Sequence, residues 1–232
     1  MSVEIEFKFR VTNEAELATL EEAAGGERLH QVAQHNTFLD TPTSSLDKAK
    51  LVLRLRSEGE VGIKPTYTLT AKGPGKKSAG GTLSKKAEEE IEIDEPVAKA
   101  LLDGTSEKTA LEILGEPPCS ASRTSLLEDL KNARGDAAIK PIGAFANLRT
   151  RVKCALPTGE NDDVITLLLE FDRTTFPGEQ HHFEVEVEVD EKDTAPAGLA
   201  MRLLLKNAEI DGRAAPGKAK RFFRALRGES ID

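Results

Sequence analysis

The stretch EIEFKF at residues 4–9 alternates charged and apolar side chains without exception. Successive side chains of a β-strand point to opposite faces, so Glu4, Glu6 and Lys8 fall on one face and the other face is wholly apolar. Residues two apart on a strand lie about 6.5–7 Å from each other, and two carboxylates at that spacing repel unless a cation lies between them. The stretch therefore predicts a strand whose ionic face needs partners of opposite charge.

The same alternation recurs on later segments, where the charged residues again come in pairs of one sign. The pairs are Arg54 and Arg56, Glu90 and Glu92, Arg149 and Arg151, Glu170 and Asp172, and Glu184 and Glu186. The exception is Lys72, which shares its face with Thr68 and Thr70. For any single strand, a solvated face with cross-strand Glu–Arg pairs is the alternative interpretation. Because an ordinary half-exposed sheet carries a mixed polar face, the repetition favours ionic faces that converge on one cavity, as they do in a closed antiparallel barrel.

Strand and helix patterns account for most of the chain. Besides the first ten residues, strands are predicted over 36–40, 51–57, 66–72, 88–94, 144–156, 164–172 and 182–189. Helices are predicted over 13–24 and 194–207, and residues 96–134 carry helical spacing that prolines and glycines cut into about three short helices. About eight strands with helices at the start, middle and end predict an α+β chain built around antiparallel sheet. The pattern leaves open whether the helical segment 96–134 is an insertion or packs against the barrel.

Composition narrows the function classes. The 232 residues fit a single domain, 1–232. The chain carries 32 Lys and Arg against 40 Asp and Glu, a net charge of −8, which argues against electrostatic nucleic-acid binding. No apolar run approaches the roughly 20 residues of a membrane helix, and charges stand where a signal peptide would be apolar. Cys119 and Cys154 match no metal or redox spacing, which is typical of a reducing compartment. We therefore expect a cytoplasmic monomer with no nucleic-acid or membrane partner.

The two kinds of ionic face favour two kinds of ligand. Carboxylates on one wall of a cavity would hold a hard divalent cation such as Mg²⁺ or Mn²⁺, which prefers oxygen ligands. Arginine and lysine on the other wall would hold a polyanion, because the guanidinium fork matches phosphate. The sequence alone does not choose between the two metals.

Nine segments resemble, in order, the CYTH domain, also called the triphosphate tunnel metalloenzyme family. They are EIEFK at 4–8, which matches the Glu-x-Glu-x-Lys signature, HNTFLDTP at 35–42, LVLRLR at 51–56, LTAK at 69–72, EEEIE at 88–92, LRTR at 148–151, LEFD at 169–172, FEVEVEV at 183–189 and KAKRFF at 218–223. The likeness covers nearly the whole chain and is greatest to short, stand-alone plant-type members that hydrolyse inorganic triphosphate.

This resemblance implies a closed eight-stranded antiparallel β-barrel that forms a tunnel with a polar, charged lumen and surrounding helices. It implies metal ligands at Glu4, Glu6, Glu90, Glu92, Asp172, Glu184 and Glu186. It implies phosphate-binding residues at Lys8, Arg54, Arg56, Lys72, Arg149, Arg151 and Lys220. Two choices stay open, since the metal-binding pair of the late strand could be Glu186 and Glu188, and Lys218 could replace Lys220.

The implied reaction is metal-dependent hydrolysis of tripolyphosphate to pyrophosphate and phosphate, with Glu4, Lys8 and Arg56 as catalytic residues. Glu4 would orient a water towards the terminal phosphorus, while the two cations would stabilise the developing charge. The alternatives are a class IV-type adenylyl cyclase, a thiamine triphosphatase and a non-catalytic polyphosphate-binding module. Aromatic residues make up only 4% of the chain and tryptophan is absent, which argues against a stacking pocket for an adenine or thiazolium ring.

Two short features carry structural expectations only. His181 and His182 lack a third ligand at a workable spacing, so we expect a surface turn there. Phe222 and Phe223 are expected to anchor the last helix against the barrel.

Overall fold

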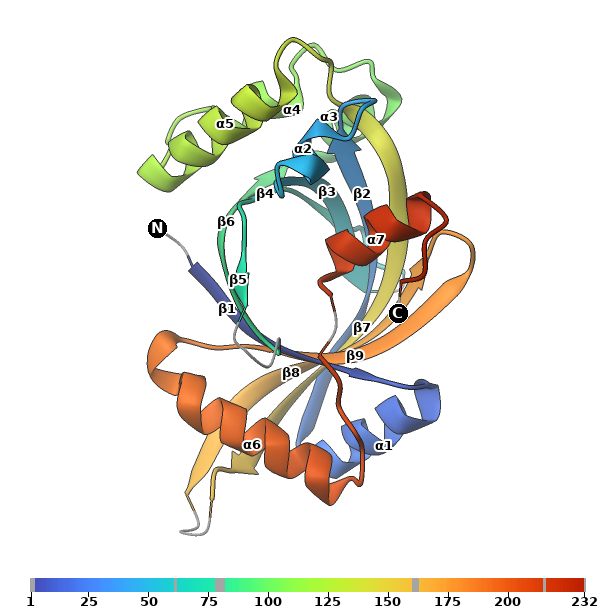
Figure 1. Cartoon of the computed structure of the whole chain (residues 1–232), viewed down its shortest axis with the longest axis vertical. Coiled ribbons are helices and arrows are strands. Elements are labelled where there is room, and N and C mark those ends of the chain that lie inside the picture. Colours follow the sequence, from blue (N-terminus) through green and yellow to red (C-terminus); the bar gives the residue numbers. More distant parts are fainter. Residues whose placement is uncertain (1–2, 61, 78–81, 160–162, 215, 232) are drawn as a thin grey trace.

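A computed structural model describes residues 3–60, 62–77, 82–159, 163–214 and 216–231, without the side chains of Val3, Glu4, Lys76 and Lys77. Within these residues, eight long antiparallel strands form one closed barrel (Figure 1). The strands are β1 (Val3–Val11), β2 (Glu27–Asp40), β3 (Val52–Glu60), β4 (Thr66–Lys72), β6 (Leu83–Ile93), β7 (Lys140–Pro157), β8 (Val164–Phe176) and β9 (Gln180–Glu188). The two-residue strand β5 (Lys76–Lys77) adds to β6. The prediction of an eight-stranded antiparallel barrel is confirmed.

The barrel closes because β1 pairs on both sides. The order runs β1-β9-β8-β7-β2-β3-β4-β6, and β6 returns to β1 through pairs from Val3–Ala87 to Phe7–Leu83. Several strands are longer than the sequence pattern predicts, and two of them begin furthest before their predicted starts. β2 begins at Glu27 rather than at 36, and β6 begins at Leu83 rather than at 88. Both extensions mix polar residues with a few apolar ones and lack strict alternation, and they are held by pairing with the distant strands β7 and β1.

Two groups of helices cover the outer, apolar face of the barrel. The first group comprises α1 (Glu14–Ala24) and α6 (Thr194–Asn207), which a 3₁₀ turn at Glu191–Asp193 precedes. It packs on the outward residues of β1, β7, β8 and β9, including Phe7 and Phe171. Asn13 begins α1 by accepting a hydrogen bond from the backbone N–H of Glu16, which satisfies a donor that a helix start leaves open.

The second group consists of α2 (Ser45–Lys48), α3 (Glu95–Asp103), α4 (Ala110–Leu114) and α5 (Ala121–Arg134). It packs on the outward residues of β3, β4 and β6, among them Leu53, Leu55 and Leu69. The helical segment that the sequence left unplaced is therefore part of the shell around the barrel, at the opposite end of the molecule from α1 and α6 (Figure 1).

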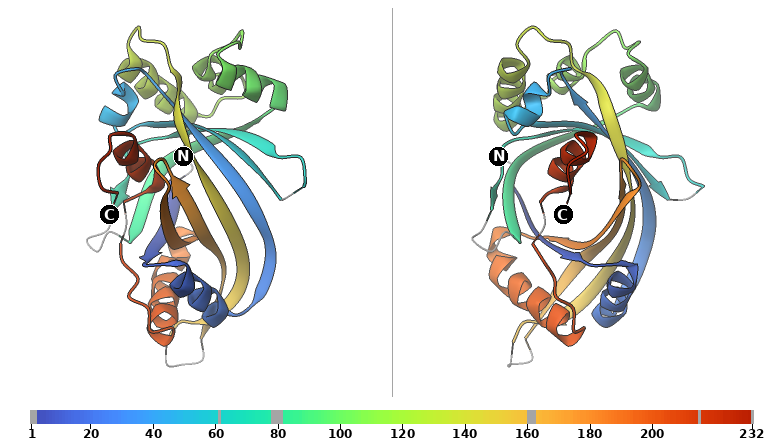
Figure 2. Two further views of the ribbon diagram at one scale, coloured as in Figure 1. Left: turned by 90° about the vertical axis from the view of Figure 1, so that its right-hand side faces the viewer. Right: turned by 45° about the vertical axis from the view of Figure 1, so that its right-hand side comes forward.

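A third apolar cluster lies at one end of the barrel, where α7 (Lys218–Leu226) sits within the opening (Figure 2). The inward residues Phe38, Phe145 and Phe176 meet Phe222 and Phe223 of the helix there. The rings of Phe38 and Phe222 stack with their centroids 4.3 Å apart. Since burial of one phenylalanine contributes about 1.5–3 kcal/mol, these contacts hold α7 firmly, and the expectation that Phe222 and Phe223 anchor the last helix is confirmed.

None of the helices in the described residues is both long enough and apolar enough to cross a membrane.

Candidate active site

The inward faces of the strands and the start of α7 enclose a cavity of about 1140 Å³. Ten of the predicted site residues line it, namely Glu6, Lys8, Arg54, Arg56, Lys72, Glu90, Arg149, Arg151, Glu186 and Lys220. Asp172 and Glu184 lie just beneath its surface and are completely buried. Glu92 is exposed near the end of β6, away from the cavity. Glu4 lies on β1, but its side chain is outside the described residues.

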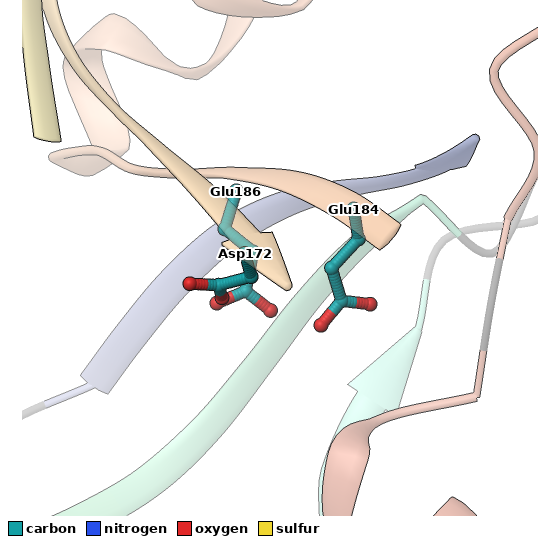
Figure 3. Close-up of side chains that lie close together, drawn as sticks. All are labelled: Asp172, Glu184 and Glu186. Carbon is teal, nitrogen blue, oxygen red and sulfur yellow. The ribbon is translucent and has the colours of Figure 1, made fainter. Parts of the chain in front are cut away.

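The deepest part of the site is a cluster of three carboxylates from two neighbouring strands (Figure 3). Asp172 of β8 and Glu184 and Glu186 of β9 each place an oxygen within 4.8 Å of the other two. Lys218 of α7 contacts all three, with its Nζ 2.7 Å from Oδ2 of Asp172 and 2.8 Å from Oε1 of Glu186. The sequence left Lys218 and Lys220 as alternatives, and Lys218 is the lysine that contacts the cluster.

Arg149 of β7 binds the same carboxylates from the other side. Its Nε donates to Oδ1 of Asp172 at 2.7 Å, and its Nη2 donates to Oδ2 of Asp172 at 2.6 Å and to Oε2 of Glu186 at 2.7 Å. Its Nη1 forms an ion pair with Glu170. Burial alone would lower the pKa of Arg149, but the charge of Asp172 raises it well above its usual value. All three guanidinium nitrogens are thus engaged, so Arg149 organises the carboxylates.

Lys8 links this cluster to Glu6 on the same strand. Its Nζ forms an ion pair with Glu186 and lies 3.6 Å from Oε1 of Glu6. Glu6 also accepts hydrogen bonds from Ser84 Oγ at 2.9 Å and Lys86 Nζ at 3.0 Å. Burial would raise the pKa of Glu6, but the charge of Lys8 brings it down to about 2. Burial likewise would lower the pKa of Lys8, and Glu186 raises it instead. Both side chains are therefore charged throughout the neutral range.

Arg221 of α7 completes the cluster at the end where the helix enters. It is fully buried and forms an ion pair with Glu184. Its Nη1 lies 3.0 Å from Nδ1 of His182, and its guanidinium lies 5.1 Å from the centre of the Phe176 ring. The prediction of a surface turn at His181 and His182 is wrong, because β9 begins at Gln180 and includes both. His181 is exposed on the strand, whereas His182 is buried and lies in phase with Glu184. The position of His182 two residues before Glu184, and hence on the same strand face, was the signal in the sequence that could have identified His182 as an inward residue.

The opposite wall of the cavity holds two arginines in ion pairs of 3.4–3.7 Å and a lysine in a shorter one. Arg56 lies 3.6 Å from Oε2 of Glu58 and 3.7 Å from Oε1 of Glu90. Arg54 lies 3.4 Å from the same oxygen of Glu90, and Lys72 lies 2.6 Å from Glu88 on β6. Burial would raise the pKa of Glu90, but the charges of Arg56 and Arg54 lower it. Since direct guanidinium–carboxylate bonds are about 2.7–2.9 Å long, Arg56 can exchange these longer contacts for an incoming anion at little cost.

Uncharged residues missed by the sequence analysis connect the two walls. Asn147 donates through Nδ2 to Oε1 of Gln34 at 2.9 Å and to Oδ1 of Asp172 at 2.8 Å. Gln34 in turn donates to Oε2 of Glu58 at 2.5 Å. Glu58 also accepts a hydrogen bond from Arg151, whose Nη2 lies 3.1 Å from Oε1 of Glu58. Gln34 and Asn147 carry no charge, so the pattern of charged pairs did not identify them, although Asn147 lies on the same strand face as Arg149.

The carboxylates fit a hard divalent cation by their chemistry. Mg²⁺ and Mn²⁺ prefer oxygen ligands, and the cluster of Asp172, Glu184 and Glu186 already holds one cation, the ammonium of Lys218. Among the predicted metal ligands whose side chains are described, Glu6, Glu90 and Glu92 do not join this cluster. Glu6 reaches it only through Lys8, and Glu90 lies on the arginine wall.

Solved structures of other proteins share this fold. HpAC1 from Hippeastrum, described as a candidate adenylyl cyclase with a dominant triphosphatase activity, has a TM-score of 0.72 and 23% identity, over 98% of this chain and 97% of that chain. A Bacillus halodurans protein described as a candidate adenylate cyclase has a TM-score of 0.57 and 19% identity, over 96% and 100% of the two chains. The PH1819 protein of Pyrococcus horikoshii has a TM-score of 0.52 and 20% identity, over 92% and 94%.

Sequence comparison gives a different kind of result. No curated protein matches the chain. The family model of the CYTH domain matches residues 2–223, and this range includes all the site residues predicted from the sequence. Because the match extends over nearly the whole chain and agrees with the barrel and its ionic lumen, the chain belongs to the CYTH domain family.

Proposed function

We propose that this protein hydrolyses inorganic triphosphate to pyrophosphate and phosphate inside the barrel, with Mg²⁺ or Mn²⁺ as cofactor. The observation that carries the proposal is the division of one cavity into a carboxylate cluster and a wall of basic residues, Arg54, Arg56 and Lys72. Tripolyphosphate carries roughly four to five negative charges near neutral pH, and fixed cations in a cavity of reduced dielectric attract such an anion strongly. HpAC1, whose fold this chain shares, is described as having a dominant triphosphatase activity.

In this proposal the cations of the cavity bind and orient the phosphate chain. Arg54, Arg56 and Lys72 contact its oxygens, because their charged groups line the cavity and suit phosphate. Of the three, Arg56 exchanges carboxylate contacts of 3.6 and 3.7 Å for the phosphate. Lys8 stabilises charge that develops at the reacting phosphorus, and Arg149 fixes the carboxylates. Arg151 and Lys220 also line the cavity, and they would contact the remainder of the phosphate chain.

The carboxylates supply the metal-binding part of the proposal. Glu4, Glu6 and the cluster of Asp172, Glu184 and Glu186 would hold the divalent cation, which neutralises phosphate charge and favours a nucleophilic water when bound. Glu4 would orient that water, and this role stays a prediction because its side chain lies outside the described residues. We further propose that the chain acts as a single tunnel domain, as a monomer and in the cytoplasm.

Adenylyl cyclase activity is the second candidate, because two of the proteins with this fold are described as cyclase candidates. A cyclase needs a surface for the adenine ring. The aromatic residues lining the described cavity are Phe38, Phe145 and Phe223, which are only 2%, 3% and 4% exposed. Their rings pack against each other at the α7 end, so they offer no open face for stacking and triphosphate is the better-supported substrate.

The test measures phosphate, pyrophosphate and cAMP formed from tripolyphosphate and from ATP, side by side, with Mg²⁺, with Mn²⁺ and with EDTA. Metal-dependent release from tripolyphosphate and little from ATP is the expected result. Preferred turnover of ATP to cAMP and pyrophosphate would support the cyclase. Tight binding of tripolyphosphate without turnover in any condition would leave a binding module and refute the catalytic proposal.

A further inference from the structure

We propose that Lys218 is a built-in, displaceable counter-ion whose ammonium occupies the cation position of the Asp172, Glu184 and Glu186 cluster. A divalent cation binds to these carboxylates only when Lys218 leaves them. The inference rests on the proposed function only in taking a divalent cation to bind within the barrel. It adds that this chain's own lysine competes for the site.

The contacts of Lys218 show the competition directly. An ammonium group has three N–H donors, and three carboxylates surround the Nζ of Lys218. These are the same three side chains whose oxygens converge within 4.8 Å. A second cation placed among these oxygens would lie a few ångströms from the ammonium, and like charges at such a separation repel strongly even at an effective dielectric of about 20.

The position of Lys218 in the fold lets its side chain move while the helix stays in place. It is the first residue of α7, and Gly217 before it makes no side-chain cap. The rest of the helix is held independently, by the ion pair of Arg221 with Glu184 and by Phe222 and Phe223 in the apolar cluster. Lysine has a flexible four-carbon stem, and Lys218 already lines the cavity of about 1140 Å³. Its ammonium can therefore turn from the carboxylates to a phosphate oxygen.

Two consequences follow for ligand binding. In the absence of metal, Lys218 neutralises buried carboxylates that would otherwise be costly to bury. When a phosphate chain binds and attracts Lys218, the cluster becomes free for the cation, so metal and phosphate each raise the affinity for the other, as linkage requires.

The test measures Mn²⁺ binding without any phosphate substrate, by electron paramagnetic resonance of free Mn²⁺. We compare wild type with Lys218→Met and with Lys220→Met. Lys220 lies two residues later on the same helix, is exposed and also lines the cavity, but it contacts no carboxylate of the cluster within the described residues. Lys218→Met should bind Mn²⁺ at least about tenfold more tightly than wild type, and Lys220→Met should stay within about twofold. Unchanged or weaker binding by Lys218→Met overturns the inference.

A second measurement needs no variant and covers the case that Lys218→Met fails to fold. Acetylation of lysines in the wild-type protein, mapped by mass spectrometry, should be slow at Lys218 in EDTA and at least several-fold faster with saturating Mn²⁺, while Lys220 stays unchanged. Protection of Lys218 that Mn²⁺ does not alter contradicts the inference. Both measurements are independent of turnover, so a protein that shows the exchange but hydrolyses nothing would refute the proposed function and leave the inference standing.

Discussion

Replacement of Arg149 by methionine should lower the free energy of unfolding by about 3 kcal/mol at pH 7. Removal of one partner from a buried ion pair typically costs about 3–5 kcal/mol, because the other charge is left uncompensated. The structure places this variant at the lower end of that range. Asp172 and Glu186 keep Lys218 as a partner at 2.7 and 2.8 Å, and Glu170 keeps Arg151 at 3.0 Å.

The assay is urea unfolding followed by far-UV circular dichroism. With a slope of about 3 kcal/mol per M, at the top of the range for small proteins, the midpoint should fall by about 1 M. Arg202→Met is the matched control, since Arg202 is exposed on α6, and it should change stability by less than about 0.5 kcal/mol. A loss below about 1 kcal/mol for Arg149→Met would show that the carboxylates are solvated and would refute the reasoning.

The effect should also depend on pH with a defined sign. Burial would raise the pKa of Asp172, but Arg149 and Lys218 lower it in the folded protein. Stability from a lowered pKa is complete above the unfolded value, about 3.9, and is lost as the pH falls through the folded value. Without Arg149 the pKa of Asp172 rises towards the unfolded value. The difference between variant and wild type should therefore shrink below about pH 4, and a constant difference down to pH 2 would contradict this cause.

Three further predictions address separate parts of the site. Arg56→Ala should lower kcat/KM for tripolyphosphate about 10²–10³-fold, which a phosphate-release assay measures. The same variant should leave the urea midpoint nearly unchanged in unfolding curves, since the ion pairs of Arg56 are 3.6 and 3.7 Å long. The stability that Glu6 contributes through Lys8 should be complete above pH 4.5 and vanish as the pH falls through about 2, so acid titrations of wild type and Glu6→Gln should converge there. Phe222→Ala should cost about 3–5 kcal/mol because Phe222 is fully buried, whereas Leu226→Ala on the same helix, 42% exposed, should cost far less in the same urea assay.

Strands with an apolar outer face were predictable from alternation alone. Residues 66–72 and the helix 194–207 were predicted with the bounds that the structure shows. Residues 27–35 have no such apolar face, and they form a strand because β7 pairs with them along its length. That pairing joins segments more than a hundred residues apart, so a local pattern does not contain it.

The candidate site likewise combines residues that a local pattern identifies with residues whose role depends on contacts between distant segments. Charged inward residues were identifiable because a run of one sign on one strand face needs an explanation. Gln34 and Asn147 carry no charge, and their role depends on hydrogen bonds across strands. Arg221 was missed because it contacts Glu184 only when α7 lies in the end of the barrel. The phenylalanines that hold α7 there come from four separate elements, so no local pattern shows the contact.

The closure of the barrel between its first and last strands affects how the chain is made. Phe7 on β1 pairs with Val187 on β9. The backbone groups on that edge of β1 therefore have no partner strand until about 180 further residues have been synthesised. At roughly 5–20 residues per second this takes about 9–36 s. An unpaired strand edge invites pairing with other chains, and charged side chains discourage it. We therefore expect Glu6 and Lys8, which line the cavity in the finished barrel, to disfavour pairing of the nascent strand with other chains as well.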